Sequence, residues 1–208
     1  MNIQEQIKAR KLDENSVEKE AIPQFKIWQK EARDAGVKLH EATSLSTITK
    51  EGKPSARMVL LKFVDEEGFI FFTNYDSPKA EMLANNPFAA MVFYWHELER
   101  QVRIEGKVEK AATELSDEYF NSRPEGNRIT SIVSPQSEVI ASRKFLDELY
   151  LNFKNRISDE KYVRPENWGG YRLFPDMIEF WQGRNNRLHD RIKYTKEGKS
   201  WKIERLAP

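Results

Sequence analysis

The sequence predicts a mainly β protein with flanking helices (α+β), built around an antiparallel β-barrel. Short segments rich in β-branched and aromatic residues follow one another along the chain, separated by turn residues such as Gly, Pro, Asp and Lys. Segments whose apolar residues recur at helical spacing lie between them. Many short strands with intervening helices favour a barrel with helical additions.

The composition points to one soluble domain. The chain has 208 residues, 32% of them charged, and a net charge of only +1. Such a balance gives no bulk attraction to nucleic acid or to a membrane. Cysteine is absent, which excludes disulfides and thiolate metal sites and fits a reducing compartment. The polar N-terminus has no signal-peptide core, and no apolar run approaches the ~20 residues that span a bilayer. We therefore expect a cytoplasmic protein.

The first half of the chain predicts a helix followed by a meander. Residues 1–20 are highly charged and weakly patterned, so we expect a mobile N-terminal arm and a single domain over residues 21–208. An apolar stripe predicts a helix over residues 22–35, with Gly36 ending it. Alternation predicts strands at 44–48, 56–64 and 69–73.

The second half continues with strands and shorter helices. Ser77 followed by Pro78 is typical of a helix start. The remaining expected helices are 114–121 and 142–157, and the expected strands are 88–95, 100–110, 168–174, 177–182, 191–195 and 200–206.

The segment Ile178–Arg191 carries the densest chemical information. It opens with an aromatic pair, Phe180 and Trp181, and then places three cationic or titratable side chains at alternate positions: Arg187, His189 and Arg191. If this segment is extended, the three side chains point to one side. Buried charges must be paired or bound to something, so we expect a cationic wall beside an aromatic surface, suited to a flat anionic ligand.

Two further groups of residues suggest phosphate sites. Thr73, Ser77 and Lys79 lie at the end of a strand and the start of a helix, where a phosphate binds readily. The alternative interpretation of Ser77 is a simple helix cap. Tyr119 and Arg123 lie four residues apart on an expected helix, as a phosphate clamp or an ordinary surface pair.

Other common sites lack support in the sequence. There is no Gly-rich dinucleotide loop and no Walker-type loop. The three histidines, His40, His96 and His189, have no metal-ligand spacing, so no metal site is expected.

Together these segments resemble the pyridoxamine 5′-phosphate oxidase family over nearly the whole chain from about residue 22. The resemblance rests on ordered motifs: 57–62, 72–74, Lys79, 98–102, 119–124, 136–137, 168–170 and 178–191. It implies an antiparallel, Greek-key split β-barrel, formed as a homodimer with FMN at the subunit interface. It also implies oxidation of pyridoxamine 5′-phosphate or pyridoxine 5′-phosphate to pyridoxal 5′-phosphate, with hydride transfer to flavin N5 and reoxidation by O2 to give H2O2.

The resemblance also implies roles for individual residues. FMN would be held by Arg57, Met58, Val59, Leu60, Leu61, Lys62, Phe72, Thr73, Lys79, Gln101, Gln136, Ser137, Trp181 and Arg191. The substrate would be held by Lys62, Tyr119, Arg123, Asn127, Arg187, Leu188 and His189. Arg187 and His189 would be the catalytic residues, lying against the pyridine ring.

The chain departs from the family pattern at a few positions. Pro78 replaces an arginine beside the FMN phosphate, Asn127 replaces a serine, and Phe72 replaces a tyrosine. The N-terminal arm lacks the Arg-x-x-Tyr pattern that covers the substrate. The shortened arm and Pro78 leave an alternative, a non-catalytic flavin- or pyridoxal-phosphate-binding protein on the same barrel. A third reading is a flavin reductase that uses a nicotinamide cofactor, whose substrate would not require the pair Arg187 and His189.

Overall fold

The computed structural model describes residues 2–156 and 162–208 of the chain. The last residue of the helix expected over 142–157 lies outside the described residues. None of the helices in the described ranges is long and apolar enough to cross a membrane.

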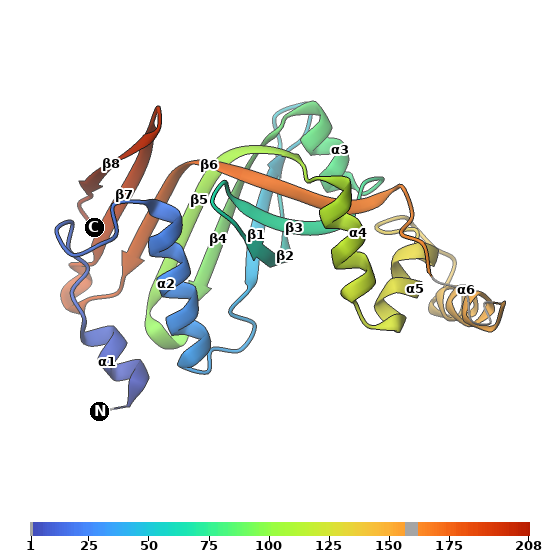
Figure 1. Cartoon of the computed structure of the whole chain (residues 1–208), viewed down its shortest axis with the longest axis horizontal. Helices are drawn as coiled ribbons and strands as arrows, with labels where there is room; N and C mark the ends of the chain where they lie inside the picture. Colours follow the sequence, from blue (N-terminus) through green and yellow to red (C-terminus); the bar gives the residue numbers. More distant parts are fainter. Residues whose placement is uncertain (1, 157–161) are drawn as a thin grey trace.

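Antiparallel strands form the body of the molecule, in the order β3-β2-β1-β4-β5-β6-β7-β8 (Figure 1). Their bounds are β1 Ala42–Ile48, β2 Pro54–Val64, β3 Phe69–Asn74, β4 Phe88–Trp95, β5 Arg100–Lys110, β6 Trp168–Gln182, β7 Asp190–Glu197 and β8 Ser200–Arg205. Because β3 also pairs with β6, strands β1 to β6 close into a barrel. β4 lies beside β1 rather than beside β3, which is the Greek-key order. The expected barrel fold is confirmed.

Strand β6 connects the barrel to the β7–β8 hairpin. Its first half pairs with β3 and its second half with β7, while β5 runs along most of its length. The two strands expected at 168–174 and 177–182 are therefore one strand. Pro175 is tolerated because the register shifts beside it at Gly106. A Cβ on Gly106 would lie 2.0 Å from the carbonyl oxygen of Phe174, so only glycine fits this close approach.

The helices gather at two ends of the barrel (Figure 1). Their bounds are α1 Ile3–Ala9, α2 Ala21–Asp34, α3 Pro78–Asn85, α4 Thr113–Ser122, α5 Glu125–Val133 and α6 Arg143–Arg156, with short 3-10 turns η1 at His96–Leu98 and η2 at Asn185–Arg187. Helix α2 buries Phe25, whose ring lies edge-on to Phe69 with centroids 4.9 Å apart. Helix α5 was not predicted, because its apolar residues are too few to show a clear period.

The N-terminal segment has a defined place in the structure. Helix α1 opens with a capping box between Asn2 and Glu5. Ile7 and Leu12 are buried, and the guanidinium of Arg184 donates hydrogen bonds to the carbonyl oxygens of Lys8 and Arg10. The segment expected to be a mobile arm is thus docked near the start of β7. The predicted domain boundary at residue 21 stays a prediction.

Candidate functional site

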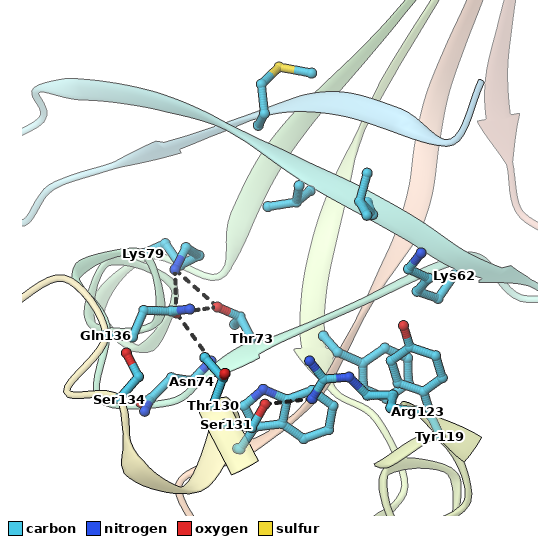
Figure 2. A pocket seen from close by; sticks show the side chains of 15 residues that line it. Lys62, Thr73, Asn74, Lys79, Tyr119, Arg123, Thr130, Ser131, Ser134 and Gln136 are labelled. Atoms are coloured by element: carbon cyan, nitrogen blue, oxygen red, sulfur yellow. Dashed lines mark hydrogen bonds between the residues drawn. The ribbon is translucent and has the colours of Figure 1, made fainter. Parts of the chain in front are cut away.

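A cavity of about 300 Å³ lies between strands β2 and β3 and helices α3, α4 and α5 (Figure 2). It collects residues that are far apart in the sequence. Its lining consists of Met58, Val59, Leu60, Lys62, Phe72, Thr73, Asn74, Lys79, Tyr119, Arg123, Thr130, Ser131, Ser134, Gln136 and Trp168.

Lys79, at the N-terminus of α3, forms the first polar cluster of this cavity. Its ammonium donates hydrogen bonds to Thr73 Oγ1 and Ser77 Oγ, both at 3.0 Å, and to Gln136 Oε1 at 3.1 Å. All three acceptors are neutral. Burial, together with the nearby charge of Arg57, lowers the pKa of Lys79 to about 8. The Ser77 side chain donates to the carbonyl of Asn74 and makes no capping bond to α3, so simple capping is not its role.

Arg57, on β2, lies near Lys79 but does not line the cavity. Its Nη1 donates to Thr47 Oγ1 at 2.7 Å and to the carbonyl of Leu45 at 3.1 Å, and its Nη2 donates to Ser55 Oγ at 2.9 Å. Burial lowers the pKa of this guanidinium as well. Arg57 therefore adds positive potential to the cavity without lining it.

Tyr119 and Arg123 on α4 form the second polar cluster, together with Lys62 on β2. The Tyr119 ring stacks on Phe72 with centroids 4.1 Å apart. The Arg123 guanidinium lies 4.6 Å from the centre of the Trp168 ring and donates to Ser131 Oγ. Burial raises the pKa of Tyr119 and lowers that of Arg123. Both Tyr119 and Arg123 line the cavity, and Figure 2 shows Lys62 on their side of it, away from Lys79.

The four cations around this cavity, Arg57, Lys62, Lys79 and Arg123, all lack a carboxylate partner in the part of the chain that the structure describes. Within residues 2–156 and 162–208, none of them forms an ion pair with a carboxylate, and the partners of Arg57, Lys79 and Arg123 are neutral. Partly buried cations that lack a counter-ion are costly, so such a cavity favours anionic ligands. The fourth cation is Lys62, which lines the cavity.

The remaining predicted residues form a second group on the outer face of β5, β6 and β7. Gln101 pairs with Trp181, and Trp181 pairs with Arg191, so the three side chains stand in a row across the strands. Nε of Arg191 donates to Glu179 Oε1 at 2.7 Å, and this hydrogen bond raises the pKa of Arg191.

The segment between β6 and β7 is a turn rather than an extended strand. Asn186 and Arg187 have φ angles of 56° and 60°, in the left-handed region. The prediction that Arg187, His189 and Arg191 share one face of a strand is therefore wrong, because β7 begins only at Asp190. The turn exposes Arg187 and Leu188.

His189 is held in one orientation by this turn. Its Nδ1 accepts a hydrogen bond of 3.1 Å from the main-chain N–H of Arg184, and its ring centroid lies 4.6 Å from that of Trp181. An Nδ1 that accepts a hydrogen bond leaves the proton of the neutral ring on Nε2. His189 thus offers an N–H donor beside the Trp181 surface.

One chain does not bring the two groups together. Trp168 borders the cavity at the start of β6, and Trp181 lies near the end of this 15-residue strand. At the usual rise of about 3.3 Å per residue, the path between them is roughly 40 Å.

Besides the second group and the β6–β7 turn, four residues predicted to bind ligands do not line the cavity. Leu61 is buried in the barrel core, Arg57 lies behind Lys79, Asn127 is exposed on α5, and Ser137 is an exposed residue with φ of 72°. The cavity also has lining residues that were not predicted: Asn74, Thr130, Ser131, Ser134 and Trp168. Recognising α5 would have suggested Thr130 and Ser131, since they follow Asn127 by one helical turn.

Comparison with known proteins gives the family. Residues 29–147 match the sequence family described as pyridoxamine 5′-phosphate oxidase, and residues 168–208 match the pyridoxine 5′-phosphate oxidase C-terminal dimerisation region. A pyridoxine/pyridoxamine 5′-phosphate oxidase from Cyanothece sp. is 47% identical over 207 residues, covering 100% of this chain and 97% of the relative.

Solved structures agree on the fold. PhzG from Burkholderia lata, in complex with tetrahydrophenazine-1-carboxylic acid, is 29% identical with a TM-score of 0.91, covering 96% of this chain and 98% of PhzG. A pyridoxamine 5′-phosphate oxidase-related, FMN-binding protein from Nostoc punctiforme has a TM-score of 0.71 at 15% identity, covering 88% and 96% of the two chains. The chain has the split-barrel fold of these proteins, and it belongs to the pyridoxamine 5′-phosphate oxidase family.

Proposed function

We propose that this protein is an FMN-dependent oxidase that converts pyridoxamine 5′-phosphate and pyridoxine 5′-phosphate to pyridoxal 5′-phosphate. The supporting relatives carry this activity in their names and align with essentially the whole chain. O2 would be the final electron acceptor, and H2O2 the second product.

The observation that carries the proposal is the presence of two cationic clusters on opposite sides of one aromatic-lined cavity (Figure 2). Neither cluster has a carboxylate counter-ion among the described residues. Lys79 lies at the N-terminus of α3, where the helix dipole and a partly buried ammonium both favour a phosphate. Lys62, Tyr119 and Arg123 form the other cluster. A phosphorylated cofactor and a phosphorylated substrate would together supply the two anions that these clusters lack.

The residues present fit FMN. Lys79 and Thr73 would hold its phosphate with Arg57 behind them, and this set provides two cations although Pro78 stands where the family has an arginine. The main chain of 58–60 would run beside the flavin. Gln101, Trp181 and Arg191 would contact the flavin ring from their row on β5, β6 and β7.

We infer that two copies of the chain form each site. The row of Gln101, Trp181 and Arg191 and the turn between β6 and β7 lie at the far end of β6 from the cavity. A single copy would therefore offer only half of the predicted contacts to one ligand pair. The match of residues 168–208 to a dimerisation region supports a homodimer. In such a dimer, the cavity of one copy would face the β6–β7 turn of the other.

The residues of this chain would bind and orient the substrate. Lys62, Tyr119 and Arg123 would fix its phosphate, while Arg187 of the second copy would lie against the ring. His189 would offer its Nε2–H as a hydrogen-bond donor, since Nδ1 is already occupied by Arg184. Bound FMN would supply the hydride acceptor, N5, and would pass the electrons to O2.

A second candidate substrate is a tricyclic carboxylic acid, because PhzG shares the fold at a TM-score of 0.91. A carboxylate would also suit one cationic cluster. Two separate clusters and the higher identity to the phosphate oxidases favour the phosphorylated pyridine.

The test is an anaerobic titration of the purified, FMN-loaded protein. Pyridoxine 5′-phosphate should bleach the flavin absorbance, and admission of O2 should restore it with release of H2O2. Parallel titrations use tetrahydrophenazine-1-carboxylic acid and NADH. A yellow protein that both phosphate substrates leave unbleached would be a binding protein, and bleaching by NADH alone would indicate a reductase.

A further inference from the structure

Glu179 is a carboxylate buried on the outer face of the sheet, where the proposed flavin contacts also lie. Glu179 is only 3% exposed, whereas its neighbours on the same face of β6 and β7 are partly exposed. Its position two residues before Trp181 places both side chains on one face of β6. The proposed function does not use this carboxylate as a ligand contact.

Both oxygens of Glu179 are engaged by arginines from the two flanking strands. Oε1 accepts from Nε of Arg191 on β7 at 2.7 Å, and Oε2 accepts from Nη1 of Arg103 on β5 at 3.1 Å. Arg103 is itself held by Glu105 Oε1, which accepts from Nη2 at 2.7 Å. The carboxylate is therefore fixed from both sides, and it fixes Arg191 in turn.

The contacts of Arg191 leave one side of its guanidinium free. Nε is held by Glu179, and Nη1 donates to the carbonyl of Ala207 at 2.9 Å. Within the described residues, Nη2 has no hydrogen-bond partner. Because a guanidinium is planar, two fixed N–H groups determine where the third nitrogen points.

A purely structural role explains this arrangement poorly. Burying a carboxylate costs desolvation energy, and well-packed apolar side chains commonly stabilise a protein as well as a buried ion pair does. What the ion pair adds is orientation of the Arg191 charge next to Trp181, its direct cross-strand partner.

We propose that Glu179 is a positioning residue that orients the Arg191 guanidinium toward the flavin, with Arg103 holding Glu179 in place. This inference rests on the proposed function, since it assumes that Arg191 contacts FMN. Glu179 itself touches neither cofactor nor substrate. Its effect on FMN should therefore pass entirely through Arg191.

The test is a double-mutant cycle between Glu179→Gln and Arg191→Met. A glutamine amide has one oxygen and one NH2 group, so it cannot accept from both arginines. Glu179→Gln should raise the Kd for FMN about tenfold, the effect of one disturbed charge-assisted hydrogen bond. It should also shift the midpoint potential of the bound flavin. In the Arg191→Met background, the same substitution should change Kd less than about twofold, because the effect depends on Arg191.

Glu204→Gln is the matched control. Glu204 lies on β8 and pairs with Lys193 at 3.4 Å and Lys202 at 2.8 Å. Among the described residues, it forms no hydrogen bond or ion pair with Arg191. This variant removes one negative charge close by and should leave the Kd and the potential unchanged. Equal effects of Glu179→Gln in both backgrounds, or no effect in the native background, would overturn the proposal.

A second measurement does not depend on FMN. The ¹H–¹⁵N signal of the Arg191 Nε group, assigned by its loss in Arg191→Met, should move or broaden in Glu179→Gln and stay in place in Glu204→Gln. If the native protein bound no FMN, the proposed function would fail while this signal still reported on the Glu179–Arg191 contact. An unchanged signal would show that Glu179 does not orient Arg191.

Discussion

Nζ of Lys79 donates a hydrogen bond to Oε1 of Gln136 at 3.1 Å, which joins α3 to the loop after α5 across 57 positions of the chain. The same Gln136 oxygen accepts from Thr73 Oγ1 at 3.0 Å. A partly buried ammonium is thus held by neutral oxygens at the place where we expect the FMN phosphate.

This contact predicts that FMN binding weakens at alkaline pH. The pKa of Lys79 without ligand is about 8, lowered from 10.5, and a bound phosphate would raise it by favouring the ammonium. The affinity for FMN is therefore highest below pH 8, where Lys79 is already protonated. Above pH 8 it falls, because binding then requires Lys79 to take up a proton. The Kd for FMN should rise by up to about tenfold per pH unit between pH 8 and the pKa of the complex.

Fluorescence titrations of FMN from pH 6.5 to 10 measure this dependence. Lys79→Met should bind FMN more weakly at pH 7 and should lose the alkaline rise. The control is Lys144→Met, which alters an exposed lysine on α6 that pairs with Glu148. A native profile that stays flat up to pH 10 would contradict the prediction.

The His189–Arg184 contact predicts different results for two substitutions of the histidine. Asparagine can place its oxygen near Nδ1 and keep the bond from the Arg184 N–H, but it lacks a donor at the Nε2 position. Glutamine reaches the Nε2 position instead. If the Nε2–H orients the substrate, His189→Asn should lower kcat about tenfold or more, and His189→Gln should keep more activity.

Steady-state kinetics with pyridoxine 5′-phosphate test this order, with the Kd for FMN as a check on the fold of the site. Loss of FMN by both variants to the same degree as loss of turnover would assign His189 to cofactor binding instead.

The separation of the two residue groups predicts activity in mixed dimers. Arg123→Met and Arg187→Met should each lose at least about tenfold in kcat/KM, the effect of one charge-assisted hydrogen bond. In a heterodimer of the two variants, one site would carry both changes and the other neither. Its rate should therefore return to about half of the native rate.

Heterodimers isolated with two different affinity tags allow this measurement. The matched control pairs Arg123→Met with Lys62→Met. Both residues line the cavity, so each copy then carries one altered cavity, both sites are impaired, and no activity should be restored. A heterodimer of Arg123→Met and Arg187→Met as inactive as its parents would rule out a site shared between copies.

The packing of α2 predicts a large loss of stability for Phe25→Ala. Phe25 is 0% exposed, and its ring lies edge-on to Phe69 and Phe93 at 4.9 and 5.1 Å. The cavity left by the substitution should lower the free energy of unfolding by about 3–5 kcal/mol. Ile27, 40% exposed on the same helix, is the control, and Ile27→Ala should cost less than about 1 kcal/mol. Urea denaturation measures both, and similar losses would show that α2 is not anchored through Phe25.

Some contacts could be predicted because they depend on local spacing. Tyr119 lies in the last turn of α4 and Arg123 directly follows this helix, so their place at one end of the cavity follows from their spacing along the chain. The position of Lys79 at a helix start follows from Ser77 and Pro78 in the same way. The turn at Asn186 and Arg187 did not follow, because left-handed φ angles at non-glycine residues have no clear pattern in the sequence.

The sequence by itself determined the strands and most helices, since the spacing of apolar residues reports which face of each element is buried. It also determined which cations exist. Only the tertiary structure decided which of them are paired: Arg191 finds Glu179 on a neighbouring strand, whereas Lys79 and Arg123 find only neutral oxygens. The tertiary structure also decided that β6 is continuous, so that the cavity and the Arg187–His189 turn lie at opposite ends of it. Pairing and separation depend on residues distant in sequence, and local spacing carries no information about them.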